Sequence, residues 1–259
     1  MVFPIADDNS DRTLFPIVTI ALLVANVFVF VVLQGMGQND DVTLAYCQVP
    51  AEIISGRDVV TETSQREIAV QGQHMVVTVP GLRPTPIPVW LTLLTAIFMH
   101  GSLMHLAGNM WFLWLFGDNV EDCMGHVRFL LFYLACGIVA SLAFVVFNAT
   151  GEAAITPCLG ASGAISGVLG AYLVLHPQRR VSVILLRMMV DVPGYVAVGI
   201  WFLFQVASGL FDPGTGGGGV AYSAHVAGFL AGMALAKPFS TAPARAEADP
   251  LVILRRRLG

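Results

Sequence analysis

Along the sequence, long runs of apolar residues alternate with polar connecting segments. The first run, at 14–33, has no charged side chain over about 20 residues, which is the length that a helix needs to cross a bilayer. Further apolar segments follow at 103–119, 127–148, 162–175, 195–211 and 221–236. The pattern predicts an all-α membrane protein whose core is a bundle of six transmembrane helices.

The first run predicts a retained membrane helix rather than a cleaved signal peptide. It is long for the apolar region of a signal peptide, and no small-x-small cleavage site follows it at 34–36. We expect an N-terminal tail at 1–13, a membrane domain at 14–237 and a C-terminal tail at 238–259. A long polar outer loop at about 35–89 joins the first two helices and ends in a proline-rich stretch.

The composition and the charge distribution agree with this interpretation. Hydrophobic residues make up 56% of the chain and charged residues 12%, whereas soluble domains carry about 25% charged residues. With the N-terminus inside, ten of the lysines and arginines fall in inner segments and three in the outer loop. We therefore expect both termini in the cytoplasm. As the default host we take a bacterial plasma membrane. No basic stripe points to nucleic acid as a partner.

The fourth apolar segment is too short to span a membrane. From Ser162 to Leu175 it would rise about 21 Å as a helix, whereas the hydrocarbon core is about 30 Å thick. With its inner end at the interface, Ser162 would lie roughly 10 Å below the outer surface. Irregular backbone at that depth must pack in protein or line a wet cavity. The segment therefore predicts a water-accessible pocket with a serine at its floor.

Three further polar residues of the predicted helices fall in the same outer half. His105 and Asn109 are four positions apart on one face of the second helix, and His225 lies near the outer end of the sixth. Together with Ser162 they supply a hydroxyl, an imidazole base and two hydrogen-bond donors, which is the inventory for acyl transfer. Each residue alone has an ordinary interpretation, such as a serine bonded to its own helix or an asparagine that joins two helices.

Small residues recur every fourth position on the fourth and sixth helices. Gly163 and Gly167 are followed by Ala171, and Gly228 and Gly232 lie on the sixth helix with His225 on nearly the same face. Such ridges let two helices approach closely in lipid. If the ridges meet, Ser162 and His225 come within hydrogen-bond range.

Other functions fit the pattern less well. A zinc site of His100, His105 and Glu121 is excluded by topology, because Glu121 belongs at the inner end of the second helix. A transporter or channel would need polar residues along a path through the whole membrane, whereas here they cluster in the outer half. No metal or organic cofactor is implied.

Three motifs in these segments resemble those of the rhomboid family of intramembrane serine proteases. His105-Leu-Ala-Gly-Asn109 is similar to its HxxxN motif, Gly160-Ala-Ser-Gly163 to GxSG, and the stretch from Ala224 to Gly232 to AHxxGxxxG. They occur in the family's order and on the expected helices. The resemblance extends over about 14–237.

The resemblance implies a Ser-His dyad without a third acidic residue. Ser162 would be the nucleophile and His225 its general base, while the Ser162 backbone N–H, His105 and Asn109 would bind the oxyanion. The substrates would be transmembrane segments of other proteins, cut near their outer ends. The main alternative is a rhomboid-like pseudoprotease that binds transmembrane clients without cutting them; such proteins typically lack one member of the dyad.

The chain departs from the family pattern at two places. Many members carry an aromatic residue four positions after the nucleophile, where it packs on the catalytic histidine; here that position is Ser166. The Trp-Arg pair of the first outer loop is also not evident, because the nearby Trp90 is followed by Leu91. Separately, Cys47 and Cys158 both fall in outer loops, so a disulfide between them would be possible in an oxidising compartment.

Overall fold

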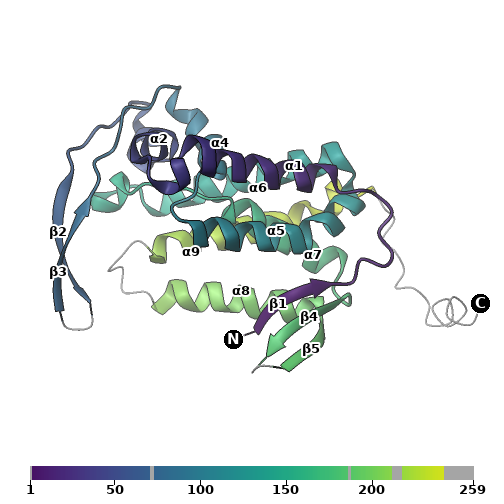
Figure 1. Cartoon of the computed structure of the whole chain (residues 1–259). Helices are drawn as coiled ribbons and strands as arrows, with labels where there is room; N and C mark the ends of the chain where they lie inside the picture. Colours follow the sequence, from purple (N-terminus) through teal and green to yellow (C-terminus); the bar gives the residue numbers. More distant parts are fainter. Residues whose placement is uncertain (1, 71–72, 186–187, 212–217, 242–259) are drawn as a thin grey trace, which may run out of the picture.

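The computed structural model describes residues 2–70, 73–185, 188–211 and 218–241, and long helices dominate it (Figure 1). Each predicted apolar segment corresponds to one of these helices, which run side by side. They are α1 (Ile17–Phe28, continued by a π-helical turn at Val29–Leu33), α5 (Leu103–Met124), α6 (His126–Phe147), α7 (Ser162–Leu175), α8 (Gly194–Phe211) and α9 (Gly218–Phe239).

Within the described region, one helix is both long and apolar enough to cross a membrane without a break. It is α6, with a mean hydropathy of 2.6. A second candidate is the pair formed by 89–98 and α5, which is bent by 78°. The segments 17–33, 162–175 and 194–207 are apolar but shorter than 18 residues. The fold is therefore mostly helical.

The expectation of an all-α fold is wrong for parts of the chain outside the long helices. At one end of the bundle, β1 (Val2–Asp7) pairs antiparallel with β4 (Arg180–Leu185), which pairs with β5 (Met188–Pro193). In the outer loop, β2 (Ser64–Val70) and β3 (Gln73–Val79) form a hairpin. These stretches are rich in β-branched residues, whose side chains favour an extended backbone.

The rest of the outer loop contains short helices. They are α2 (Asp40–Tyr46), α3 (Pro50–Ser55) and α4 (Thr92–Thr95), with 3₁₀ turns at Gly35–Gly37, Val89–Leu91, Ala96–Phe98 and Gly151–Ile155. The sixth apolar segment, predicted from 221, begins earlier, because Gly218 is already the first residue of α9. Residues 212–217 lie outside the described residues, as does the part of the predicted C-terminal tail from 242 onward.

The second helix is longer than predicted because its polar end is bound by the N-terminal segment. The Asp122 side chain accepts hydrogen bonds from the backbone N–H groups of Thr13 and Leu14. Glu121 accepts from the backbone N–H groups of Val18 and Thr19, which begin α1. Carboxylates that satisfy the free N–H groups of another helix need not face water, so α5 continues to Met124.

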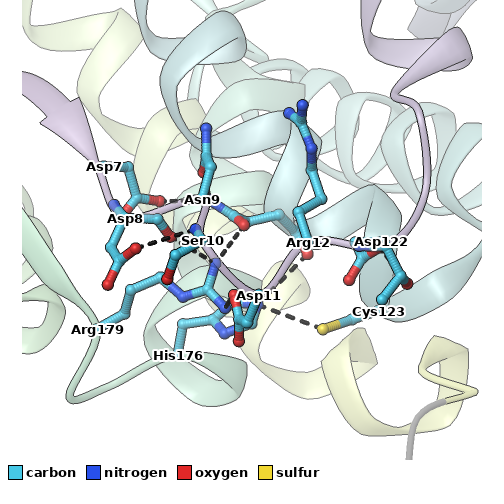
Figure 2. A network of polar contacts seen from close by, with 12 residues as sticks. Asp7, Asp8, Asn9, Ser10, Asp11, Arg12, Asp122, Cys123, His176 and Arg179 are labelled. Atoms are coloured by element: carbon cyan, nitrogen blue, oxygen red, sulfur yellow. Dashed lines mark hydrogen bonds and ion pairs between the residues drawn. The ribbon is translucent and has the colours of Figure 1, made fainter. Parts of the chain in front are cut away.

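The same end of the bundle holds a network of charged and polar side chains (Figure 2). Arg179, which precedes β4, donates to the backbone oxygen of Asp8 and forms an ion pair with Asp11 at 2.6 Å. The backbone N–H of Thr241, beyond the end of α9, donates to the backbone oxygen of Cys123. The segment that leads into α1 and the residue that follows α9 therefore both lie at the carboxyl end of α5, opposite the end where α5, α7 and α9 begin.

Candidate active site

The Ser162 hydroxyl and the His225 ring lie in direct contact. The distance from Ser162 Oγ to His225 Nε2 is 2.7 Å, although the two residues are 63 positions apart in the chain. Ser162 is the first residue of α7, and His225 lies near the amino end of α9. An imidazole nitrogen at this distance can accept the hydroxyl proton when the oxygen attacks a carbonyl carbon.

Close packing of two small-residue ridges brings these helices together. A Cβ atom at Gly228 would overlap the backbone oxygen of Gly163, and one at Gly232 would overlap the backbone oxygen of Gly167. The ridges predicted on α7 and α9 therefore lie backbone against backbone. Ser162 lies one residue before Gly163, and His225 lies three residues before Gly228, so the close approach of the two ridges brings the two side chains together.

His105 and Asn109 lie beside the backbone that precedes the serine. Gly160 has φ +122°, and a Cβ there would lie 2.8 Å from His105 Cε1 and 3.7 Å from Asn109 Nδ2. Only glycine allows this close approach in this backbone conformation. Asn109 is 7% exposed, and its Nδ2 lies 3.0 Å from Nε2 of the fully buried His100. His100 therefore orients the amide of Asn109.

An apolar cavity opens at these groups. Its volume is about 100 Å³. The chemical groups at its wall are His105, Ser162 and His225, together with the thiol of Cys158. The remaining lining residues are small or apolar: Ile97, Gly137, Ala140, Ser141, Leu159, Gly160, Gly163, Ala164 and Ala224. Of the four residues predicted for the dyad and the oxyanion site, Asn109 is the one that does not line the cavity.

Cys158 contributes a thiol, a second kind of nucleophile, to the cavity wall. Burial raises the pKa of its thiol to about 12, so the sulfur stays protonated and weakly nucleophilic at neutral pH. Cys47 and Cys158 are both free thiols, and the possible disulfide between them is not formed. The outer loop is joined to the segment before Ser162 by backbone instead, through paired Gln48–Cys158 hydrogen bonds of 2.9 and 2.8 Å.

Gln205 on α8 is a site residue that sequence reasoning missed. Its Oε1 lies 2.9 Å from His225 Nδ1, the ring nitrogen that does not face Ser162. The Tyr222 ring stands edge-on to the His225 ring, with centroids 6.3 Å apart. Ser166, at the position where many rhomboids have an aromatic residue, is fully buried and donates to the backbone oxygen of Ser162 at 2.6 Å. A lone amide in an apolar helix was the signal that could have revealed Gln205.

Comparisons with known proteins match this region of the chain. The family model described as Rhomboid domain matches residues 88–241. Rhomboid protease GluP of Bacillus subtilis is 38% identical over 149 residues, which cover 58% of this chain and 27% of the relative.

Mitochondrial proteins match as well. The human presenilin-associated rhomboid-like protein is 37% identical over 103 residues, 39% of this chain and 27% of its own length. Rhomboid protein 1 of Saccharomyces cerevisiae is 32% identical over 146 residues, 55% of this chain and 40% of its own. The chain thus spans well under half the length of these curated relatives.

The family-model match covers more than half of the chain, and within it lie α5, α7 and α9 with the contacting Ser162 and His225. The chain therefore belongs to the rhomboid family of integral membrane proteins.

Proposed function

We propose that this protein is an intramembrane serine endopeptidase that hydrolyses peptide bonds in or near transmembrane segments of other membrane proteins. The observation that carries the proposal is the 2.7 Å contact between Ser162 Oγ and His225 Nε2 at the wall of a cavity. The similarity to Rhomboid protease GluP supports the same reaction class.

In the proposed reaction, Ser162 Oγ attacks the scissile carbonyl carbon while its proton passes to His225 Nε2. The tetrahedral intermediate collapses, and the protonated ring gives this proton to the leaving amine. Water, activated in turn by His225, then hydrolyses the acyl-enzyme. The Ser162 backbone N–H, His105 and Asn109 are the proposed donors to the oxyanion. No cofactor enters these steps.

Six membrane crossings fit the arrangement of the described chain. The segment that enters α1 and the segment that leaves α9 lie at the same end of the bundle, as an even number of crossings requires. Several helices also expose large apolar side chains that suit contact with lipid. They are Val24 and Phe28 on α1, Val32 on the π-helical turn that follows it, Val146 and Phe147 on α6, and Leu203 and Phe204 on α8. We propose the boundaries 14–237 for this membrane domain, with the segments 1–13 and 238–259 flanking it.

The proposed orientation follows the charges, which place both termini in the cytoplasm. The cavity then opens toward the outer side. A bacterial plasma membrane is the proposed host. This choice does not rest on the comparisons, because the relatives include both a Bacillus protein and mitochondrial proteins.

A pseudoprotease that binds transmembrane clients is the second candidate. The contact between Ser162 and His225 favours the enzyme, because binding alone has no use for a base placed against a hydroxyl. A fluorophosphonate probe distinguishes the two, since it phosphonylates only an activated serine. Purified wild-type protein in detergent should be labelled at Ser162, and the Ser162→Ala protein should not.

The cleavage itself is tested in liposomes with a panel of single-span proteins whose transmembrane segments contain helix-breaking residues. We expect a new amino terminus near the outer end of the segment with wild-type protein and none with Ser162→Ala. Absence of both labelling and cleavage in well-folded wild-type protein would refute the proposed function.

A further inference from the structure

The His225 ring nitrogen that faces away from Ser162 is contacted by α8, a helix that contributes no residue to the predicted dyad or oxyanion site. Gln205 Oε1 on α8 lies 2.9 Å from His225 Nδ1, while Nε2 of the same ring lies 2.7 Å from Ser162 Oγ. We propose that Gln205 is a positioning residue that fixes the tautomer and the orientation of His225. This inference rests on the proposed protease function.

The tautomer follows from the chemistry of the contact. The carbonyl oxygen of an amide only accepts hydrogen bonds, so His225 Nδ1 must carry the proton of the neutral ring. His225 Nε2 then has a free lone pair and can accept the proton of Ser162 Oγ. In the other tautomer Nε2 is protonated and cannot act as a base. Gln205 therefore selects the one neutral form of His225 that can activate Ser162.

The same contact persists when the ring becomes charged. After the proton transfer both ring nitrogens are donors, and a charged N–H donates a stronger hydrogen bond than a neutral one. Gln205 thus stabilises the cationic His225 that forms during the reaction. It does so without placing a negative charge beside the dyad, in contrast to the aspartate of a Ser-His-Asp triad.

Aromatic packing explains why Gln205 faces inward. The Phe202 ring of α8 stacks on the Phe229 ring of α9 with centroids 4.3 Å apart, and Trp201 also lies against Phe229 at 6.3 Å. These contacts fix the rotation of α8 against α9. Gln205 is one turn beyond Phe202, so it shares the inward face. The neighbouring Phe204 is 55% exposed and points away.

The hydrogen bond to His225 also explains how the polar amide of Gln205 is accommodated on α8. The residues of α8 are otherwise almost entirely apolar, and a polar side chain in such a setting costs free energy unless it is hydrogen-bonded. The contact with His225 meets that need. Gln205 in turn takes the place of the aromatic support that Ser166, directed to the Ser162 backbone oxygen, does not provide.

Two replacements of Gln205 by side chains of similar length distinguish the effect of its hydrogen bond from the effect of its volume. Gln205→Met removes the acceptor and keeps the volume, whereas Gln205→Glu keeps an acceptor and adds a charge. Phe204→Leu, on the exposed face of the same helix, is the matched control. Each purified protein is measured in detergent for its melting temperature and for the rate of Ser162 labelling by a fluorophosphonate probe between pH 5 and 9.

We expect Gln205→Met to label about tenfold more slowly than wild type at neutral pH, the factor that corresponds to one hydrogen bond lost from the transition state. Gln205→Glu should keep most of the labelling rate, and the acidic limb of its pH profile should move to higher pH, because a carboxylate stabilises the protonated ring. Phe204→Leu should match wild type in rate and profile.

The outcomes separate this inference from the proposed function. If wild type and Gln205→Met label at the same rate with the same pH profile, Gln205 does not position His225, while the protease proposal stands. If wild type labels no better than Ser162→Ala, the protease proposal itself fails. Should Gln205→Met not fold, the Glu variant decides: a folded Gln205→Glu protein with an unshifted acidic limb also overturns the inference.

Discussion

The backbone oxygen of Gly163 and the Cα atom of Gly228 meet where α7 and α9 cross, with no room for a side chain between them. Gly163 is one residue from Ser162, and Gly228 is three residues from His225. The distance between the hydroxyl and the imidazole therefore depends on two glycines that take no part in the proposed reaction. The packing of the two helices and the geometry of the candidate dyad are therefore one property of the structure.

Gly228→Ala should inactivate the protein without removing a reacting group. The added methyl group would overlap the backbone oxygen of Gly163 and force α9 away from α7, at a cost of about 1–3 kcal/mol in stability. Gly199→Ala on α8 is the control, because a Cβ there has nothing within 4 Å. The measurements are melting temperature and probe labelling. A Gly228→Ala protein with wild-type labelling would show that the close approach is not needed.

Ser162 and His225 should behave as a unit. Ser162→Ala or His225→Ala should each abolish cleavage, and the double variant should be no worse than either, because a dyad fails when either member is lost. Ser166→Ala should retain substantial activity, since its hydroxyl bonds only to the Ser162 backbone oxygen. The comparison is made by the rate of appearance of a cleaved transmembrane substrate in liposomes. An active Ser162→Ala beside an inactive Ser166→Ala would reverse the assignment of the nucleophile.

Asn109→Ala should lower kcat while leaving KM nearly unchanged. Loss of one oxyanion donor costs about 10²–10³ in rate, because the donor acts mainly on charge that develops in the transition state. His105→Ala should behave similarly, and the loss could be larger because its ring also lines the cavity. If Asn109 serves only to join helices through His100, kcat would stay normal and only the melting temperature would fall. Both quantities are measured on one preparation.

The N-terminal strand should be held less firmly as the pH rises from about 4 to about 7. Burial raises the pKa of Asp7 from 3.8 to about 7, although hydrogen bonds from Tyr172 and Asn119 act against the shift. In that range the folded protein keeps a proton that the unfolded segment has released, so opening releases a proton and stability falls with pH. Above about pH 7 this contribution becomes constant.

Hydrogen exchange of the backbone amides of β1 measures this effect as the free energy of local opening. The wild-type value should fall between pH 5 and pH 8 after correction for intrinsic exchange rates. Asp7→Asn cannot titrate and should show a smaller change over the same interval. Equal changes in the two proteins would show that Asp7 does not govern the docking of β1.

The long helices and the contact between α7 and α9 could be predicted from the sequence, because they depend on properties that are local in the chain. Apolar length and the position of polar interruptions are readable along the chain, so the short helix from Ser162 to Leu175 was predicted with its observed ends. The spacing of small residues predicted which faces of α7 and α9 could approach. The order of the three motifs indicated the family that the Rhomboid domain match then showed.

Other features were decided only by the tertiary structure, because they join residues that are far apart in the chain. The pairing of β1 with β4 brings residues 2–7 against 180–185, and no local pattern in the N-terminal segment specifies that partner. The length of α5 depends on the N-terminal segment that binds Glu121 and Asp122. The contact of Gln205 with His225 depends on the rotation of α8, which the ring stack of Phe202 on Phe229 sets.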